Sequence, residues 1–339
     1  MKAEVAPTRR DVVASFGTAQ LLRFIGPRWS EGTKRTPLLL VPSLINRWYV
    51  LDLRKGASLV AAMVPDRDVF CLDFGAPEDE DRYTSFDVVM ARLRHAVRTV
   101  LRETQSNKLA LLGYCMGGTL TAIHTSMYPE TVAGLVNLAG PIDFSEGGIL
   151  RHMVDERWFD AAAITLTGNI SPRTMQSGFV AMQPTVQVSK WINLLARGHS
   201  KEDRESFAAL DAWASDNVAF PGAAYVTYIE ELYQDNALAK GEFHVAGRRV
   251  DLGRITCPVM TIVASRDAIC PPKAATALNA KVASDDTTVL EIPGGHVGAV
   301  VGKKASEKLY PALAKWLAEK TDSQIRRATP PSVEQFAVP

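Results

Sequence analysis

Residues 113–118 read Gly-Tyr-Cys-Met-Gly-Gly, and this stretch decides how the rest of the chain is interpreted. The residues before it, 108–112, form a mainly apolar run typical of a buried strand, and residues 119–124 have the character of a helix. A strand, a sharp turn and a helix therefore follow one another, with Cys115 at the turn. Glycines two residues to either side of Cys115 allow that turn, because side chains there would clash.

This order of elements is the nucleophile elbow of α/β-hydrolases, with cysteine where serine is usual. The N-terminus of the following helix would point at Cys115 and favour a thiolate and an oxyanion there. A free cysteine is more often a small buried apolar residue, and the Gly-x-Cys-x-Gly pattern alone is a weak signal. Its position between a strand and a helix favours catalysis.

Two polar residues further along the chain complete a catalytic set. Asp267 follows the strand predicted at 258–264, and His296 follows the strand predicted at 287–292. The chain order nucleophile, acid, base is that of α/β-hydrolases, whose sites gather at the carboxyl ends of the strands. We expect His296 to take the thiol proton of Cys115, and Asp267 to orient and stabilise the imidazole.

The oxyanion donors and the acid leave alternatives open. In α/β-hydrolases the loop after the first buried strand supplies one backbone N–H. Here it would come from Leu44 or Ile45, and the other from Met116, although that loop could be an ordinary connection. Asp73 also ends a predicted strand, but it precedes the nucleophile in the chain, so Asp267 is the better candidate.

Short apolar strands alternate with helices along most of the chain and indicate an α/β fold with a mostly parallel sheet. Strands are predicted at 37–42, 68–74, 108–112, 132–138, 258–264 and 287–292, and helices at 11–24, 58–63, 86–103, 119–124 and 303–319. We expect an N-terminal helix and linker at 1–35, an α/β-hydrolase core at 36–141 and 255–320, a mainly helical cap (lid) at 142–254, and a flexible tail at 321–339.

The cap segment carries many aromatic residues. Among them are Trp213, Tyr225, Tyr228 and Tyr233. Residues of this kind are more often core than substrate contacts. A helical lid over such a site can nevertheless gate access to it.

Length and composition exclude several classes of protein. The 339 residues suit one large α/β domain with an insertion or two small domains. A net charge of +1 gives no electrostatic case for nucleic acid. The four cysteines show neither metal-ligand spacing nor a disulfide pattern, and we expect Cys270 to be partly exposed. No signal core or membrane span is evident, so we expect a cytoplasmic protein. We also expect neither a metal nor a cofactor.

Beyond the elbow, the chain resembles polyhydroxyalkanoate synthases, especially those that work with a second subunit. The resemblance covers residues 37–320 in the order of the family, and its segments are at 44–47, 51–53, 113–119, 231–236, 240–242, 247–252, 255–259 and 292–298. The catalytic residues of that family fall on Cys115, Asp267 and His296. Residues 73–75 and 267–268 depart from the usual motifs of the family.

The resemblance implies an (R)-3-hydroxyacyl-CoA substrate. Cys115 would attack the thioester, release CoA and carry the acyl group until a hydroxyl takes it and forms an ester of a growing polyester. CoA is then part of the substrate and no cofactor. The resemblance also implies a separate activating subunit, and it leaves open a homodimer and a place at the surface of polyester granules.

Two other functions remain open. A thioesterase or esterase would use Cys115, His296 and Asp267 with water as the acceptor. A granule-associated or partner-binding subunit would have little activity of its own, although the intact set of three residues argues against it.

Overall fold

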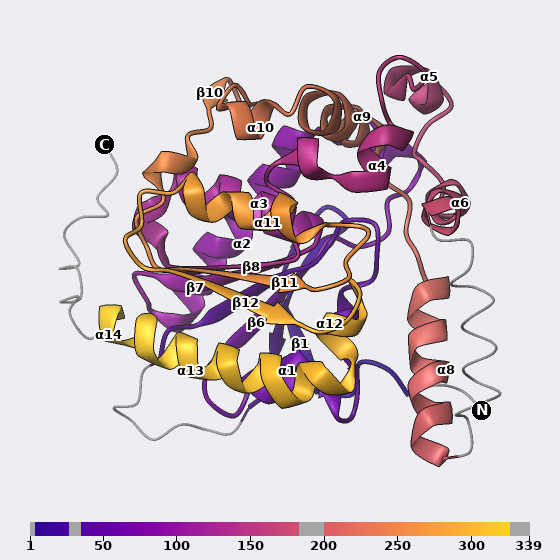
Figure 1. The fold of residues 1–339 in the computed structure, drawn as a ribbon. Helices are drawn as coiled ribbons and strands as arrows, with labels where there is room; N and C mark the ends of the chain where they lie inside the picture. Colours follow the sequence, from indigo (N-terminus) through magenta and orange to yellow (C-terminus); the bar gives the residue numbers. More distant parts are fainter. Residues whose placement is uncertain (1–3, 27–34, 183–199, 326–339) are drawn as a thin grey trace.

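An eight-stranded sheet forms the centre of the computed structural model, which describes residues 4–26, 35–182 and 200–325 (Figure 1). The strands in chain order are β1 (Arg10–Phe16), β2 (Ala19–Phe24), β3 (Leu38–Val41), β6 (Val69–Asp73), β7 (Leu109–Tyr114), β8 (Val132–Leu138), β11 (Val259–Ala264) and β12 (Thr287–Ile292). They lie in the order β1-β2-β6-β3-β7-β8-β11-β12. All neighbours from β6 to β12 are parallel, whereas β2 pairs antiparallel with β6 and with β1. The predicted α/β fold is confirmed.

Helices cover both faces of the sheet, which is why β7 and β8 are buried at every residue. One apolar cluster joins the sheet to α2 (Phe86–Thr104) and α3 (Met116–Met127). A second cluster joins the other face to α1 (Leu59–Met63), α12 (Gly298–Val301) and α13 (Tyr310–Lys320). Figure 1 shows these two helical layers above and below the sheet.

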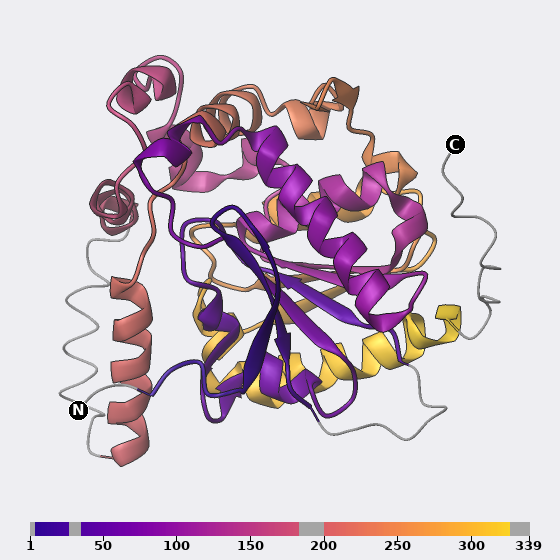
Figure 2. The ribbon, with the colours of Figure 1, turned by 180° about the vertical axis from the view of Figure 1, so that it is seen from behind.

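The chain between β8 and β11 is mainly helical. Its elements are α4 (Gly148–Met153), α5 (Ala161–Thr165), α6 (Pro172–Met182), α8 (Lys201–Ser215), α9 (Gly222–Thr227), the π-helical η5 (Tyr228–Gln234), α10 (Ala237–Lys240), and the short strands β9 (His244–Val245) and β10 (Arg248–Arg249). Both views show most of these elements in one layer, while α8 runs down the side of the molecule (Figures 1 and 2). The division into core and cap stays a prediction, and residues 183–199 of the cap lie outside the described residues.

Short elements connect the larger ones. They are η1 (Trp48–Leu51), β4 (Asp52–Arg54), β5 (Ala57–Ser58), η2 (Asp79–Tyr83), η3 (Pro129–Thr131), η4 (Phe144–Glu146), η6 (Leu252–Arg254), α11 (Pro272–Thr276), η7 (Ala277–Ala280), η8 (Ala305–Leu309) and α14 (Asp322–Ile325). Nowhere in the described part of the chain is a helix long and apolar enough to span a bilayer.

The helix predicted at 11–24 is wrong, because this segment forms the β1–β2 hairpin. Phe16 pairs with Ala19, so Gly17 and Thr18 make a two-residue turn, and Gly17 has φ of +64°. A glycine at a two-residue turn is a hairpin signal. Pairing of β2 with β6 buries Leu21 and extends the sheet, which a helix here could not do. The linker at 27–34 lies outside the described residues.

The flexible tail predicted at 321–339 is wrong for its first residues. α14 is held to the core by the Asp322 carboxylate, which accepts a hydrogen bond from the N–H of Thr36 (3.0 Å) and pairs with Arg67 (3.3 Å). Residues 326–339 lie outside the described residues.

Candidate active site

Cys115 lies at the sharp turn between β7 and α3. Its φ of 57° and ψ of −129° depart from the regions that non-glycine residues usually adopt, and such backbone strain costs about 1–3 kcal/mol. The Cys115 N–H donates to the carbonyl of Leu138 (2.9 Å), which fixes the turn against β8. The predicted elbow is therefore present, with Cys115 half-buried at the end of the strand.

Two glycines allow the elbow to pack. A Cβ on Gly117 would lie 1.9 Å from the carbonyl oxygen of Val41, at the end of β3, and a Cβ on Gly113 would lie 2.2 Å from the carbonyl oxygen of Gly117. The loop that follows β3 is thereby brought against the first turn of α3, beside Cys115.

Asp267 and His296 meet at the ends of the neighbouring strands β11 and β12. The Arg266 N–H donates to the carbonyl of Gly294 (2.8 Å) and ties the two loops together. Asp267 Oδ2 lies 2.7 Å from Nδ1 of His296, and Asp267 Oδ1 accepts the N–H groups of Ile269 and Cys270, both at 2.9 Å. Because both carboxylate oxygens are held, Asp267 can fix the orientation and tautomer of the imidazole.

His296 also contacts the nucleophile. Burial alone would lower the pKa of His296, but the charge of a Cys115 thiolate and hydrogen bonds to Asp267 and Cys115 raise it to about 10. The ring of Tyr114 stacks on the imidazole, with centroids 5.2 Å apart and an interplanar angle of 28°. The structure therefore brings Cys115, His296 and Asp267 together in an arrangement suited to proton transfer from the thiol.

The other cysteines differ from Cys115 in their surroundings. Cys71, Cys257 and Cys270 are buried, and burial raises the pKa of each thiol, that of Cys257 to about 12. The expected exposure of Cys270 is wrong, because its side chain packs with α11. Only thiolates are effective nucleophiles, so these three thiols are poor candidates.

The rival acid, Asp73, lies elsewhere. Its Oδ1 accepts the N–H of Gly75 (2.9 Å), and the residue lines a separate hollow with Arg10 and Trp48. No cluster of histidine, cysteine, aspartate and glutamate side chains in the described ranges could hold a metal ion.

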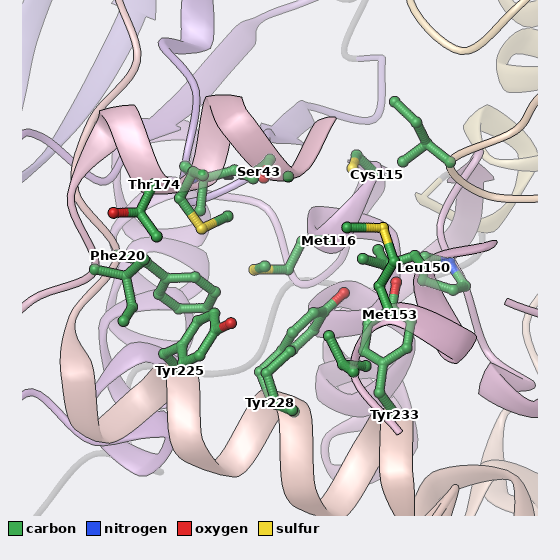
Figure 3. A pocket seen from close by; sticks show the side chains of 18 of the residues that line it. Ser43, Cys115, Met116, Leu150, Met153, Thr174, Phe220, Tyr225, Tyr228 and Tyr233 are labelled. Atoms are coloured by element: carbon green, nitrogen blue, oxygen red, sulfur yellow. Dashed lines mark hydrogen bonds between the residues drawn. The ribbon is translucent and has the colours of Figure 1, made fainter. Parts of the chain in front are cut away.

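A mainly apolar cavity of about 180 Å³ opens beside Cys115 (Figure 3). Its lining includes Met116, Met153, Val154, Ile170, Phe220, Tyr225, Tyr228 and Tyr233. In Figure 3 the side chains of Tyr225, Tyr228 and Tyr233 project from one helical segment into the pocket, with Tyr233 near Met153. Most of these residues come from the segment predicted as the cap.

The cavity lining bears on the oxyanion donors. Met116 is the first residue of α3, so its N–H has no acceptor within the helix. Ile45 lines the cavity, whereas Leu44 does not, and the Ile45 N–H has a long contact with Ser43 Oγ (3.4 Å). A stronger acceptor at Cys115 could take that N–H, so the geometry favours Ile45 with Met116.

Sequence reasoning missed the tyrosines as cavity residues. Tyr228 and Tyr233 are buried, as expected of core residues, yet they also line the cavity. They are five residues apart, a spacing that places side chains on different faces of an α-helix. In the π-helical η5 their rings contact each other, with centroids 5.6 Å apart.

Two family models match the chain. A family model of the α/β hydrolase fold matches residues 36–303, and one of the N-terminus of poly-beta-hydroxybutyrate polymerase (PhaC) matches residues 2–63. A poly(3-hydroxyalkanoate) polymerase subunit PhaC of Allochromatium vinosum is 31% identical over 315 residues, which are 92% of this chain and 88% of that one. The chain belongs to the poly(3-hydroxyalkanoate) polymerase family. The predicted resemblance is confirmed.

Relatives in this polymerase family differ in length. The poly(3-hydroxyalkanoate) polymerase subunit PhaC of Haloferax mediterranei is 32% identical over 327 residues, which are 95% of this chain but 66% of that relative. Solved structures match at lower identity. A Thermogutta terrifontis esterase has a TM-score of 0.55 and 18% identity, covering 92% of this chain and 99% of that one. A Paleococcus ferrophilus monoacylglycerol lipase has a TM-score of 0.53 and 17% identity, covering 85% and 97%. These structures support the α/β-hydrolase fold alone.

Proposed function

We propose that the chain is an acyltransferase that polymerises (R)-3-hydroxyacyl units from CoA thioesters into a polyester. The observation that carries the proposal is the Asp267–His296 pair beside Cys115, at the mouth of an apolar cavity, in a chain of the polymerase family. An apolar lining suits acyl chains and disfavours water as the acceptor.

The first half of the reaction forms an acyl-cysteine. His296 accepts the thiol proton, and the Cys115 sulfur attacks the thioester carbonyl carbon. The N–H groups of Met116 and Ile45 stabilise the oxyanion. The bond from carbon to the CoA sulfur breaks, and CoA leaves with the proton that His296 returns.

The second half transfers the acyl group to an alcohol. The hydroxyl of another hydroxyacyl unit gives its proton to His296, and its oxygen attacks the acyl-Cys115 carbonyl. An ester bond forms, the bond from carbon to Cys115 sulfur breaks, and the thiol regains a proton from His296. A thioester is a more activated acyl donor than an oxygen ester, which favours transfer to the hydroxyl. Each cycle therefore adds one ester.

The test is CoA release from (R)-3-hydroxybutyryl-CoA, with the products sized. We expect wild type to release CoA and form polymer, and Cys115→Ala to do neither. Cys257→Ala is the matched control, because its buried thiol lies outside the cavity, and it is expected to retain activity. Free 3-hydroxybutyrate without polymer would replace the proposal with a thioesterase.

A second subunit is part of the same proposal. If wild type alone is inactive, candidate activating subunits encoded with the chain are added. CoA release only in the pair would support a partnered acyltransferase. Inactivity in every combination would favour the partner-binding alternative. A homodimer and a place at granule surfaces stay predictions.

A further inference from the structure

The loop after β3 and the chain after α8 are joined by a set of hydrogen bonds, although some 170 residues separate them in sequence. Asn46 and Asn217 form an isolated antiparallel bridge, and the Asn46 side-chain amide donates to Asn217 Oδ1 (2.5 Å). The N–H of Val218 donates to the carbonyl of Ile45 (3.2 Å). The segment predicted as the cap therefore pairs with the backbone of the loop that carries the candidate oxyanion donor.

Asp216 is the centre of this junction. Its Oδ1 accepts from Arg47 Nε (3.1 Å), and its Oδ2 accepts from the hydroxyl of Tyr49 (2.9 Å). One carboxylate therefore holds two residues of the loop at once. Burial and the neighbouring Asp216 raise the pKa of the Tyr49 hydroxyl, which keeps it protonated as a donor.

Trp213 adds an anchor on the α8 side. Its indole N–H donates to the carbonyl of Arg47 (2.9 Å), and its ring is buried in the same apolar cluster as Trp48. The end of α8 is thus fixed to the protein interior, and Asp216 follows it directly. Asp216 is therefore fixed in place relative to the loop that it binds.

The held loop faces the nucleophile. Ile45 lines the cavity together with Cys115 and Met116, and its carbonyl is the one that Val218 engages. The Ile45 N–H makes only the long contact with Ser43 among the hydrogen bonds described for this loop. A small displacement of this peptide would move the donor away from an oxyanion, and displacements of about 1 Å can cost about 10²-fold in rate.

We infer that Asp216 is a positioning residue that sets the oxyanion site through Arg47 and Tyr49. The assignment rests on the proposed function for the role of Cys115 and Ile45. It makes the chain after α8 a structural partner of the oxyanion loop.

The experiment compares Asp216→Asn and Tyr49→Phe with Asp68→Asn in the full chain. Asp68 pairs with Arg23 (2.8 Å), and the side-chain exposures of that pair, 32% and 41%, are close to those of Asp216 and Arg47, 44% and 31%. Initial rates of acyl release are measured with (R)-3-hydroxybutyryl-CoA and with p-nitrophenyl butyrate, which needs the nucleophile and oxyanion site but no hydroxyacyl group.

We expect Asp216→Asn to lower kcat about 10- to 100-fold with little change in KM, below the loss for a missing oxyanion donor. Tyr49→Phe should lose less, and the double variant should resemble Asp216→Asn because both act through one carboxylate. Asp68→Asn should stay within about two-fold of wild type, the effect of an ordinary exposed pair.

Alkylation of Cys115 by iodoacetamide separates positioning from general damage, because it needs the thiolate but no oxyanion donor. Its rate should be unchanged in Asp216→Asn. Two results would overturn the inference. One is a fall in the alkylation rate that parallels the fall in kcat, and the other is a kcat of Asp216→Asn within two-fold of wild type on both substrates. Wild-type activity on the ester without activity on the CoA thioester would refute the proposed substrate and still test Asp216.

Discussion

At the residue scale, the reactivity of each cysteine thiol depends on the side chains that surround it. Cys115 is half-buried beside an imidazole, whereas the other three thiols are buried among apolar groups. Burial would lower the pKa of His296, but the charges of and hydrogen bonds to Cys115 and Asp267 outweigh it and raise that pKa. The stability of this arrangement therefore depends on the Asp267 carboxylate.

Replacing Asp267 tests this dependence. Asp267→Asn keeps the shape but loses the charge that stabilises the imidazolium, so CoA release should fall about 10²- to 10⁴-fold. Asp251→Asn is the control, since Asp251 Oδ1 also accepts a backbone N–H (Gly253, 2.9 Å) but lies in an exposed loop. Equal rates for Asp267→Asn and wild type would remove Asp267 from the mechanism.

Tyr114 supports the imidazole by its ring. Its hydroxyl is buried and has no hydrogen-bond partner in the described part of the chain. Tyr114→Phe keeps the stacked ring and should retain most of kcat, while Tyr114→Leu removes the stack and should lower kcat several-fold. Steady-state kinetics on both variants check this, and equal kcat values would show that stacking does not orient His296.

At the scale of elements, the elbow depends on how closely α3 packs against β3. The Gly117 site has no room for a methyl group, because Val41 and Pro42 carbonyls face it. Backbone atoms cannot rotate away as side chains do. The packing of these two elements therefore fixes the distance between Cys115 and the oxyanion loop.

The matched pair Gly117→Ala and Gly178→Ala measures this constraint. Gly117→Ala should destabilise the fold by about 3 kcal/mol or more, the upper range of overpacking. Gly178 lies in α6 with nothing within 4 Å of an added Cβ, so alanine there should gain about 0.5–1 kcal/mol. Urea unfolding gives both values, and similar stabilities would contradict the close packing.

His124 makes α3 sensitive to acid. Burial, with the nearby Arg94 guanidinium, lowers the pKa of His124 from 6.5 to about 3, and neither ring nitrogen has a partner in the described residues. Its ring packs on Tyr128, over which Arg94 and Arg248 also lie. The folded chain therefore excludes a proton that the unfolded chain binds below pH 6.5.

The sign of the pH effect follows from that difference. Above pH 6.5, His124 is neutral in both the folded and the unfolded chain and does not change the free energy of unfolding. As the pH drops from 6.5 toward 3, that free energy falls by at most about 1.4 kcal/mol per pH unit. His124→Phe keeps a ring against Tyr128 but does not titrate, so its unfolding free energy should fall less between pH 6.5 and 4.5. Parallel losses in urea titrations of both proteins would contradict this.

At the scale of the whole molecule, a buried ion pair joins the last described helix to the segments that lead into the sheet. Arg67 precedes β6, Thr36 precedes β3, and Asp322 belongs to the last described helix. Arg67 Nη1 donates to the carbonyl of Thr36 (3.1 Å) and to Asp322 (3.3 Å). Burial lowers the pKa of the Arg67 guanidinium while Asp322 raises it, so the pair depends on its acidic member.

Asp322→Ala should cost about 3–5 kcal/mol, because it leaves the Arg67 charge buried without its partner. Glu319→Ala removes an exposed i,i+4 partner of Lys315 in α13 and should cost less than about 1 kcal/mol. Chemical unfolding of both variants decides. If Asp322→Ala lost no more unfolding free energy than Glu319→Ala, the contacts of α14 would add little to the stability of the fold.

The sequence by itself determined the parallel sheet and the three candidate catalytic positions. Buried strands appear as short apolar runs, and the glycines around Cys115 meet a steric demand that is local. The positions of Asp267 and His296 follow because parallel strands end at one edge of the sheet. Each of these inferences needs only neighbours in sequence or the general geometry of such sheets.

Tertiary structure alone decided the other features. The hairpin at 11–24 belongs to the central sheet only because β2 pairs with β6. Tyr228 and Tyr233 share a face only because η5 is π-helical, and Ile45 is favoured over Leu44 only by its place in the cavity. Asp216 meets Arg47 across a separation that local patterns do not encode. Local propensity reports what each segment favours alone, and packing then selects which distant groups meet.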